Sequence, residues 1–181
     1  MSQSVKRTST SGKLHQPEPN SCLLHFPMAG FKMSVQPPRR MQANSYLYPP
    51  VMAKQSLRAA DGSVDYFATA TVIDRQGSVL DGCLQGTKAV SRFEIAGSKP
   101  GSRSFVFPFT DLSISYPGTY TVRIDIYQYM PGDYAGAALI DQLYSKSISV
   151  TDTPTPRESP SSDERLVLRK AREAGIPVQT S

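Results

Sequence analysis

Residues 117–127 have the sequence PGTYTVRIDIY, in which apolar and polar residues alternate after a Pro-Gly turn. The residues that would face the core are Tyr120, Val122, Ile124 and Ile126. Those that would face water are Thr119, Thr121, Arg123 and Asp125. A period of two with one apolar face predicts a β-strand that covers a core on one side and meets solvent on the other.

Shorter stretches on both sides of this strand have the same character. Phe31, Met33 and Val35 alternate with polar residues and predict a strand at 31–35. We expect further strands at residues 51–57, 66–73, 79–84, 90–95, 104–109, 139–144 and 147–150, with 130–138 as a surface loop. Glycines and prolines separate many of these stretches, as is typical of sandwiches and barrels. The pattern therefore predicts an all-β fold.

The C-terminal region departs from this pattern. Residues 151–162, TDTPTPRESPSS, are predicted to be a proline-rich linker. Ser161 and Glu164 have the spacing of a capping box, and Gly175 followed by Pro177 supplies a stop signal. The sequence therefore predicts one closing helix at residues 163–174, with an apolar stripe sufficient to dock on the sandwich but not to stand alone.

The length of 181 residues suits one domain with tails, since a domain typically has about 100–200 residues. Residues 1–20 are polar and basic and are expected to be a disordered tail, residues 21–178 the domain, and residues 179–181 a second tail. Apolar runs are too short to span a bilayer, so no membrane partner is expected. Cys22 and Cys83 are interpreted as free thiols in a reducing compartment, because no secretory signal is evident.

The net charge of +5 is distributed unevenly. Residues 1–60 contain eight Lys or Arg residues and one acid, Glu18, whereas residues 61–150 carry a net charge of −2 and residues 151–181 are balanced. A basic excess in the first third favours a polyanionic partner, because neutralised phosphates release condensed counterions. For the tail residues Lys6, Arg7 and Lys13, a merely solvated basic tail is the alternative.

Histidine and cysteine are scarce, which argues against most catalytic and metal chemistry. His15 lies in the expected tail, and His25 has no evident nucleophile or acid partner. Cys22 and His25 have a C-x-x-H spacing, but no second such pair follows to complete the four ligands of a structural zinc. Phosphate-binding glycine motifs are absent from the sequence. We expect a chain that is not an enzyme, with no cofactor and no metal.

Three segments, in this order, resemble the velvet domain of fungal developmental regulators. They are FKMSVQPPRR with the later YPPV, then SFVFPFTDLSISYPGTYTVRIDIY, then SKSISV followed by the linker and ERLVLRKAREAGIPV. Together they cover roughly residues 30–178. Residues 41–48 carry no charge, where that family is usually more basic.

The resemblance implies an immunoglobulin-like (Rel-type) β-sandwich. It also implies sequence-specific DNA binding in the nucleus, with shuttling through the cytoplasm as a further expectation. The partner would be a second copy or another velvet protein, in a homodimer or heterodimer, and the role would be transcriptional control of development, sporulation and secondary metabolism.

The expected DNA-binding residues lie around one loop. The loop begins with Pro37-Pro38 and ends with Pro49-Pro50, so both of its anchor points are stiff while Arg39 and Arg40 project between them. This limits the entropy lost when the two guanidinium groups bind DNA. The other candidates, which would extend the same surface, are Lys32, Gln36, Lys54 and Arg58.

Two other functions stay open. A diverged sandwich could be a protein-interaction subunit that does not itself bind DNA, with Tyr127, Tyr129, Tyr134 and Tyr144 marking the partner surface. A sandwich that binds a small ligand would need a large apolar pocket with converging polar groups.

Overall fold

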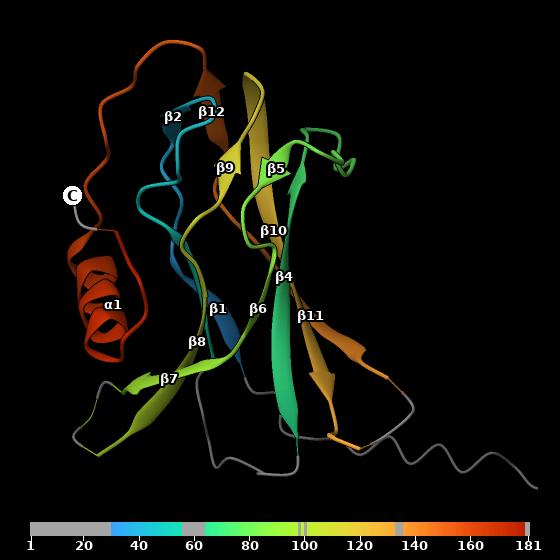
Figure 1. Ribbon diagram of the computed structural model, residues 1–181, viewed down its shortest axis with the longest axis vertical. Helices are drawn as coiled ribbons and strands as arrows, with labels where there is room; N and C mark the ends of the chain where they lie inside the picture. Colours follow the sequence, from blue (N-terminus) through green and yellow to red (C-terminus); the bar gives the residue numbers. More distant parts are fainter. Residues whose placement is uncertain (1–29, 56–63, 98, 100, 133–135, 180–181) are drawn as a thin grey trace, which may run out of the picture.

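The computed structural model describes residues 30–55, 64–97, 99, 101–132 and 136–179. Two larger sheets, one two-stranded sheet and one helix are found there (Figure 1). The strands are β1 (Phe31–Val35), β2 (Arg40–Gln42), β3 (Val51–Gln55), β4 (Asp65–Ile73), β5 (Leu84–Gln85), β6 (Ala89–Ser91), β7 (Phe93–Ala96), β8 (Arg103–Phe109), β9 (Ser113–Ile114), β10 (Gly118–Tyr129), β11 (Ala138–Tyr144) and β12 (Ile148–Thr151). The helix is α1 (Ser162–Glu173).

The two larger sheets pack as the layers of a sandwich. The four-stranded sheet has the order β1-β3-β8-β7, and the six-stranded sheet has the order β2-β12-β10-β4-β6, with β11 also paired to β10. The main core includes apolar residues from both sheets, among them Val51, Ala53, Ala70, Val72, Phe107, Phe109, Val122 and Ile124. The structure therefore confirms a mostly β, sandwich-like fold with one C-terminal helix.

Strand β10 confirms the alternation predicted from PGTYTVRIDIY. Its apolar residues have low exposed fractions, 8% for Tyr120 and 0% for Val122, Ile124 and Ile126. It pairs with β4 from Thr121 opposite Ile73 to Tyr129 opposite Asp65. Its other edge pairs with β12 near its start and β11 near its end, so this strand organises the larger sheet.

The prediction that Asp125 faces water was wrong, because its exposed fraction is 5%. The Arg123 guanidinium donates to its carboxylate at 2.9 Å, and the Gln142 amide donates at 2.7 Å. Asp125 does lie on the outer face of the six-stranded sheet, as the alternation predicted. Arg123 and Gln142 lie on the same face, and their side chains cover the Asp125 carboxylate.

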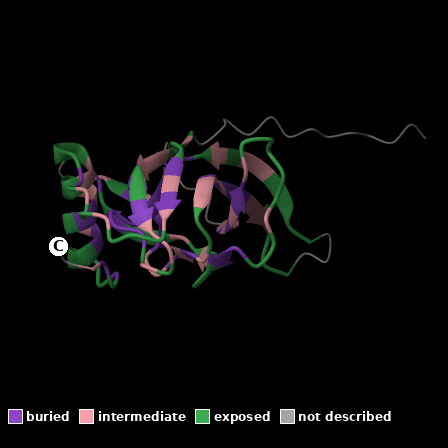
Figure 2. Ribbon diagram, turned by 90° about the horizontal axis from the view of Figure 1, so that it is seen from above, coloured by how far each residue is buried: buried purple, intermediate pink, exposed green. Residues whose placement is uncertain are grey.

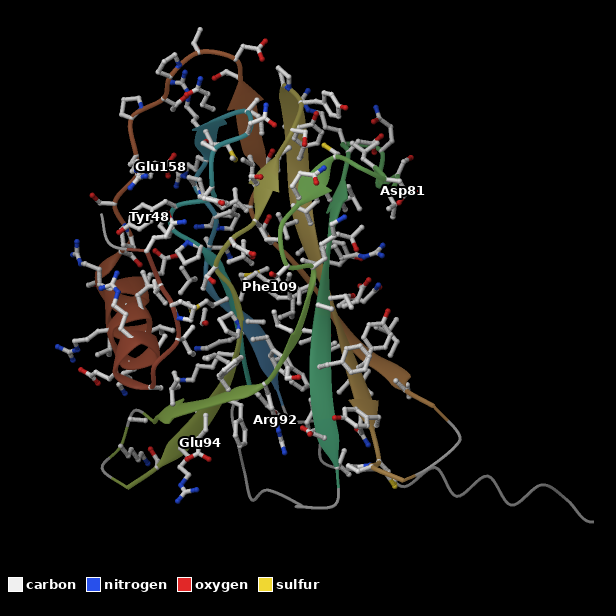
Figure 3. All side chains as sticks on the ribbon, in the orientation of Figure 1. Tyr48, Asp81, Arg92, Glu94, Phe109 and Glu158 are labelled. Carbon is white, nitrogen blue, oxygen red and sulfur yellow. The ribbon has the colours of Figure 1, made fainter. Side chains whose placement is uncertain are left out.

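The predicted strand at 90–95 is two strands in different sheets. Strand β6 pairs with β4 and β7 pairs with β8, and Arg92 lies between them. Arg92 forms an ion pair with Asp65 at 2.9 Å, and its guanidinium lies over the Tyr66 and Phe105 rings, 5.4 and 4.5 Å from their centroids. Arg92, labelled in Figure 3, thus holds the point at which the chain passes from one sheet to the other.

Two other strand predictions need correction. The stretch 79–84 is mostly turn: Val79 makes an isolated bridge to Ile73, and β5 begins only at Leu84. Short β2 was missed within the predicted loop, because its parallel pairing with β12 links residues more than a hundred positions apart. The strand predicted at 51–57 ends at Gln55, beyond which residues 56–63 lie outside the described ranges.

Helix α1 covers the outer face of the four-stranded sheet. Leu168 and Ala171, with Ile176 and Val178 beyond the helix, form a second apolar cluster with sheet residues that include Met52. The helix turns buried residues toward the sheet and exposed ones outward (Figure 2). The predicted capping box is present at its start. Within the described ranges, no helix has the length and apolar character required to cross a membrane.

The Asp111-Leu112-Ser113 segment contacts a tight turn. Gly86 has φ of +99°, and a Cβ there would overlap with the backbone carbonyl of Asp111. The Asp111 carboxylate accepts hydrogen bonds from the N–H and hydroxyl of Thr87, at 3.0 and 2.7 Å. Glycine is therefore required at residue 86 by both backbone conformation and close approach.

Candidate nucleic-acid interface

The loop between β1 and β2 is fixed at Gln36. Its N–H donates to Oε1 of Glu164 on α1 at 2.9 Å, and its side-chain oxygen accepts from the N–H of Lys146 at 2.9 Å. Gln36 thus joins the end of β1 to the helix and to the β11–β12 connection. Since this oxygen is occupied, a base contact by Gln36, which stays a prediction, would use its side-chain NH₂ group.

The next part of the loop is held by Glu158 of the linker. Oε1 of Glu158 accepts from the N–H of Arg39 at 2.9 Å and from the N–H of Arg40 at 3.2 Å. Both arginines are exposed, and neither forms an ion pair with a described residue. The carboxylate therefore orders the backbone of the loop while both guanidinium groups remain available.

Two tyrosines adjoin this loop in a cleft of about 200 Å³. Tyr46 is 58% exposed, whereas the Tyr48 ring is buried and has the Arg157 guanidinium 5.6 Å from its centroid. Arg40 and Gln42 also line the cleft. Of the two rings, that of Tyr46 is open to solvent, and arginine beside an exposed aromatic ring is the combination that nucleic-acid-binding surfaces use for phosphate contact and base stacking.

Two further clefts lie along the linker. One of about 210 Å³ is lined by Tyr48, Ser159, Arg165 and Arg172, among others. The other, of about 490 Å³, lies between the β1–β2 loop and the start of α1, and Ser159 lines it as well. Figure 3 shows Tyr48 and Glu158 on the side of the molecule where the linker descends to the helix. The three clefts therefore form one continuous surface, which we call the linker face.

The linker face carries an excess of basic groups. Its six basic side chains are Arg39, Arg40, Lys146, Arg157, Arg165 and Arg172. Its two acids, Glu158 and Glu164, both accept hydrogen bonds from backbone N–H groups. The face therefore attracts anions, and its acids are already engaged within the protein.

The carboxyl group of Glu164 is held in its charged form. Burial alone would raise its pKa, but hydrogen bonds from the N–H of Gln36 and from Ser161, together with the nearby Lys146 charge, lower the pKa below its ordinary value. The Ser161 N–H and hydroxyl each donate to Oε2 at 2.8 Å. This carboxylate thus acts as a structural connector between α1 and the loop.

A second basic group lies on the outer face of the four-stranded sheet. Lys32 and Lys54 are opposite each other in the register of β1 and β3. Burial lowers the pKa of Lys54, and the neighbouring charges of Lys32 and Lys170 lower it further. Lys170 donates to the carbonyl oxygen of Gly97. Lys32 and Lys54 thus lie close to Lys170 of α1, and the three positive charges repel one another.

The six residues expected to bind DNA thus fall into separate groups. Gln36, Arg39 and Arg40 lie on the linker face. Lys32 and Lys54 lie opposite each other in the four-stranded sheet. Arg58 lies outside the described residues. The strands of the two lysines belong to the four-stranded sheet, whereas Arg40 begins a strand of the other sheet, so the structure does not show one continuous surface for all six.

Sequence reasoning missed most of the linker face, because its residues come from distant parts of the chain. Lys146 follows β11, Arg157 lies in the linker, and Arg165 and Arg172 lie on α1. One signal was present: the two helix arginines are seven residues apart, which is about two turns, so they share a helix face. The uncharged stretch 41–48 contributes tyrosines rather than charge.

The remaining sequence expectations concern metal ligands and cysteines. Within the described ranges, no group of three or more His, Cys, Asp or Glu side chains could hold a metal ion. Cys83 is buried and is not in a disulfide with a described residue, whereas Cys22, His15 and His25 lie outside those ranges. The chain matches no model of a protein family and no curated protein.

Proposed function

We propose that this chain binds DNA through the linker face and acts as a transcriptional regulator of the kind that the velvet resemblance implies. The observation that carries the proposal is the set of six basic side chains along adjoining clefts, where both acids are engaged by backbone N–H groups. Guanidinium groups suit this role because they contact phosphates and guanine edges with paired donors.

The proposal includes the assignment of the fold to the immunoglobulin-like class of the Rel type. Two mostly antiparallel sheets packed face to face support an immunoglobulin-like sandwich of the Rel type. In such a domain, connections gathered at one end present the binding residues on a rigid framework. Action in the nucleus, pairing with a velvet-type partner, and control of development, sporulation and secondary metabolism follow from the resemblance and are proposed on that basis.

The test is a fluorescence-anisotropy titration of random-sequence duplex DNA at two salt concentrations. We expect the DNA affinity of the unaltered chain to fall as the salt concentration rises. The Arg39→Ala/Arg40→Ala variant should bind DNA about ten-fold or more weakly at low salt, and its dependence of log affinity on log salt concentration should be shallower by the equivalent of about two phosphate contacts. Alanine retains the N–H groups that Glu158 accepts, so the loop should remain ordered.

The matched control is Lys88→Ala/Lys99→Ala, which removes the same charge from exposed positions outside the linker face. Its affinity should stay close to that of the unaltered chain. Equal losses in the two double variants would contradict a localised interface, and absence of salt-dependent binding by the unaltered chain would reject the DNA-binding function.

A second candidate function, partner binding, is favoured by the outer face of the six-stranded sheet. The rings of Phe67 and Tyr127 are stacked with centroids 4.9 Å apart, and Tyr129 lies 6.0 Å from Phe67. Leu139 and Tyr144 on β11 are 49% and 52% exposed. We call these five residues the aromatic face. Phe67, Tyr127 and Tyr129 are half-buried, and aromatic residues gathered on a partly exposed surface are characteristic of protein interfaces.

The proposed occupant of the aromatic face is a second copy of this chain. Strand β11 pairs only with β10 among the described strands, so its other edge could extend the sheet across a two-fold axis. In Figure 1, β11 and α1 lie on opposite sides of the molecule, so both surfaces can be used at once. Sedimentation velocity should show a dimer that Leu139→Asp/Tyr144→Asp converts to monomer, and a monomeric unaltered chain would exclude this candidate.

A further inference from the structure

The linker contains three steps in which a hydroxyl residue precedes proline: Thr153-Pro154, Thr155-Pro156 and Ser159-Pro160. Such steps are the acceptor pattern of proline-directed protein kinases. The two threonines are engaged locally, since Thr155 Oγ1 donates to the carbonyl of Thr153 at 3.3 Å and Thr153 Oγ1 lies 3.5 Å from Thr151 Oγ1. The Ser159 hydroxyl, in contrast, forms no hydrogen bond with a described residue, and the residue is exposed.

We propose that Ser159 is a phosphorylation site and that its phosphate closes the linker face to DNA. Residues 154–160 have no regular secondary structure, and Ser159 itself is exposed. Glu158 immediately before it is tied to the β1–β2 loop, and Pro160 immediately after it is buried. The position of the serine between two fixed neighbours is therefore well defined.

The modification is an ordinary phosphoryl transfer from MgATP bound to the kinase. The Ser159 oxygen attacks the γ-phosphorus, and the new oxygen–phosphorus bond forms as the bond to the ADP oxygen breaks. The hydroxyl proton passes to the base of the kinase, and ADP leaves with the electron pair of the broken bond. The product has a charge of about −1.5 to −2 at neutral pH.

Basic side chains lie on both sides of that position. Ser159 lines the larger cleft with Arg39 and Lys146, and it lines the helix-side cleft with Arg165 and Arg172. A phosphate there would accept charge-assisted hydrogen bonds from the same groups that are proposed to contact DNA. It would also lie close before the capped start of α1, where negative charge is favourable.

Two consequences follow, and only the first rests on the proposed function. The phosphate competes with DNA phosphates for the same guanidinium groups, so phosphorylation should weaken DNA binding. It also ties the linker to α1 and to the β1–β2 loop, so phosphorylation should stabilise the fold whether or not the chain binds DNA.

The experiment treats the full chain with a proline-directed kinase and MgATP, locates the phosphate by tandem mass spectrometry, and measures both DNA affinity and Tm. We expect a phosphate on Ser159, a loss in DNA affinity of roughly ten- to a hundred-fold near 0.1 M salt from about two lost contacts, and a rise in Tm of about 2–4 °C. Ser159→Ala should show neither effect. Ser162→Ala, which alters an exposed serine followed by aspartate, should behave like the unaltered chain.

The outcomes separate this proposal from the proposed function. Absence of phosphate on Ser159, with the kinase active on a reference peptide, overturns the proposal. If Ser159 is phosphorylated but Tm does not change, the proposed contacts between the phosphate and the surrounding basic groups are refuted. If Ser159 is phosphorylated but the DNA affinity does not change, the proposed regulation of DNA binding is refuted. If the untreated chain binds no DNA, the proposed function fails, while the phosphate position and Tm still decide whether Ser159 is a modification site.

Discussion

Replacement of Glu158 by glutamine should increase the affinity of this chain for DNA. The substitution removes one of the two negative charges on the linker face, while an amide oxygen can still accept from the N–H groups of Arg39 and Arg40. In the counterion-release relation, one additional contact near 0.1 M salt is worth up to about eight-fold in affinity. Because Glu158 is half-buried and solvent screens part of its charge, we expect an increase of about two- to five-fold.

Anisotropy at 50 and 200 mM salt measures this change. Asp81→Asn is the matched control, because it removes an exposed charge on the other side of the molecule from Glu158 in Figure 3. Glu158→Ala removes the acceptor as well, and should also lower the stability of the fold by about 1 kcal/mol, since water replaces these exposed hydrogen bonds. An unchanged or weakened affinity in Glu158→Gln would refute the assignment of DNA binding to the linker face.

Three further predictions concern the framework of the site. Leu168→Ala should lower the unfolding free energy by about 2–5 kcal/mol in thermal denaturation, because the Leu168 side chain is buried between α1 and the four-stranded sheet. Leu166→Ala should change it little, because Leu166 is 41% exposed. Gly86 and Gly77 both have positive φ, but a Cβ would overlap with backbone atoms only at Gly86. Urea denaturation should therefore show that Gly86→Ala lowers the unfolding free energy by about 2 kcal/mol more than Gly77→Ala does. The pKa of Glu164 is lowered in the folded chain, so its carboxylate stabilises the fold above the ordinary pKa of glutamate, and this stabilisation is lost as pH falls. Stability measured as a function of pH should therefore decline less steeply between about pH 5 and 3 in Glu164→Gln than in the unaltered chain.

The sequence predicted those parts of the fold that follow from a local pattern. Strand β10, strand β4 and the capped helix each carry their own periodicity or end signals, and the structure confirms them. The change of sheet at Arg92 was missed because residues 90–95 were interpreted as one apolar stretch. Only the pairing of β6 with β4 and of β7 with β8, which depends on distant residues, divides that stretch between two sheets.

The site was less predictable for the same reason. The prolines beside Arg39 and Arg40 drew attention to the β1–β2 loop, but the Glu158 carboxylate that orders this loop is 119 residues from Arg39. The pattern of charge in the first third of the chain could not show that the closing helix brings Arg165 and Arg172 to the same surface. It also grouped Lys32 and Lys54 with the loop, whereas sheet membership separates them from Arg40.

The linker therefore does more than join the sandwich to its last helix. Glu158 holds the backbone from which Arg39 and Arg40 extend, and Ser159 lies between those arginines and the basic residues of α1. Removal of charge at the first position and addition of charge at the second act on one set of guanidinium groups. Opposite effects of Glu158→Gln and of Ser159 phosphorylation on DNA affinity, with the aromatic face unaltered, would show that two adjacent linker residues set the electrostatics of the interface.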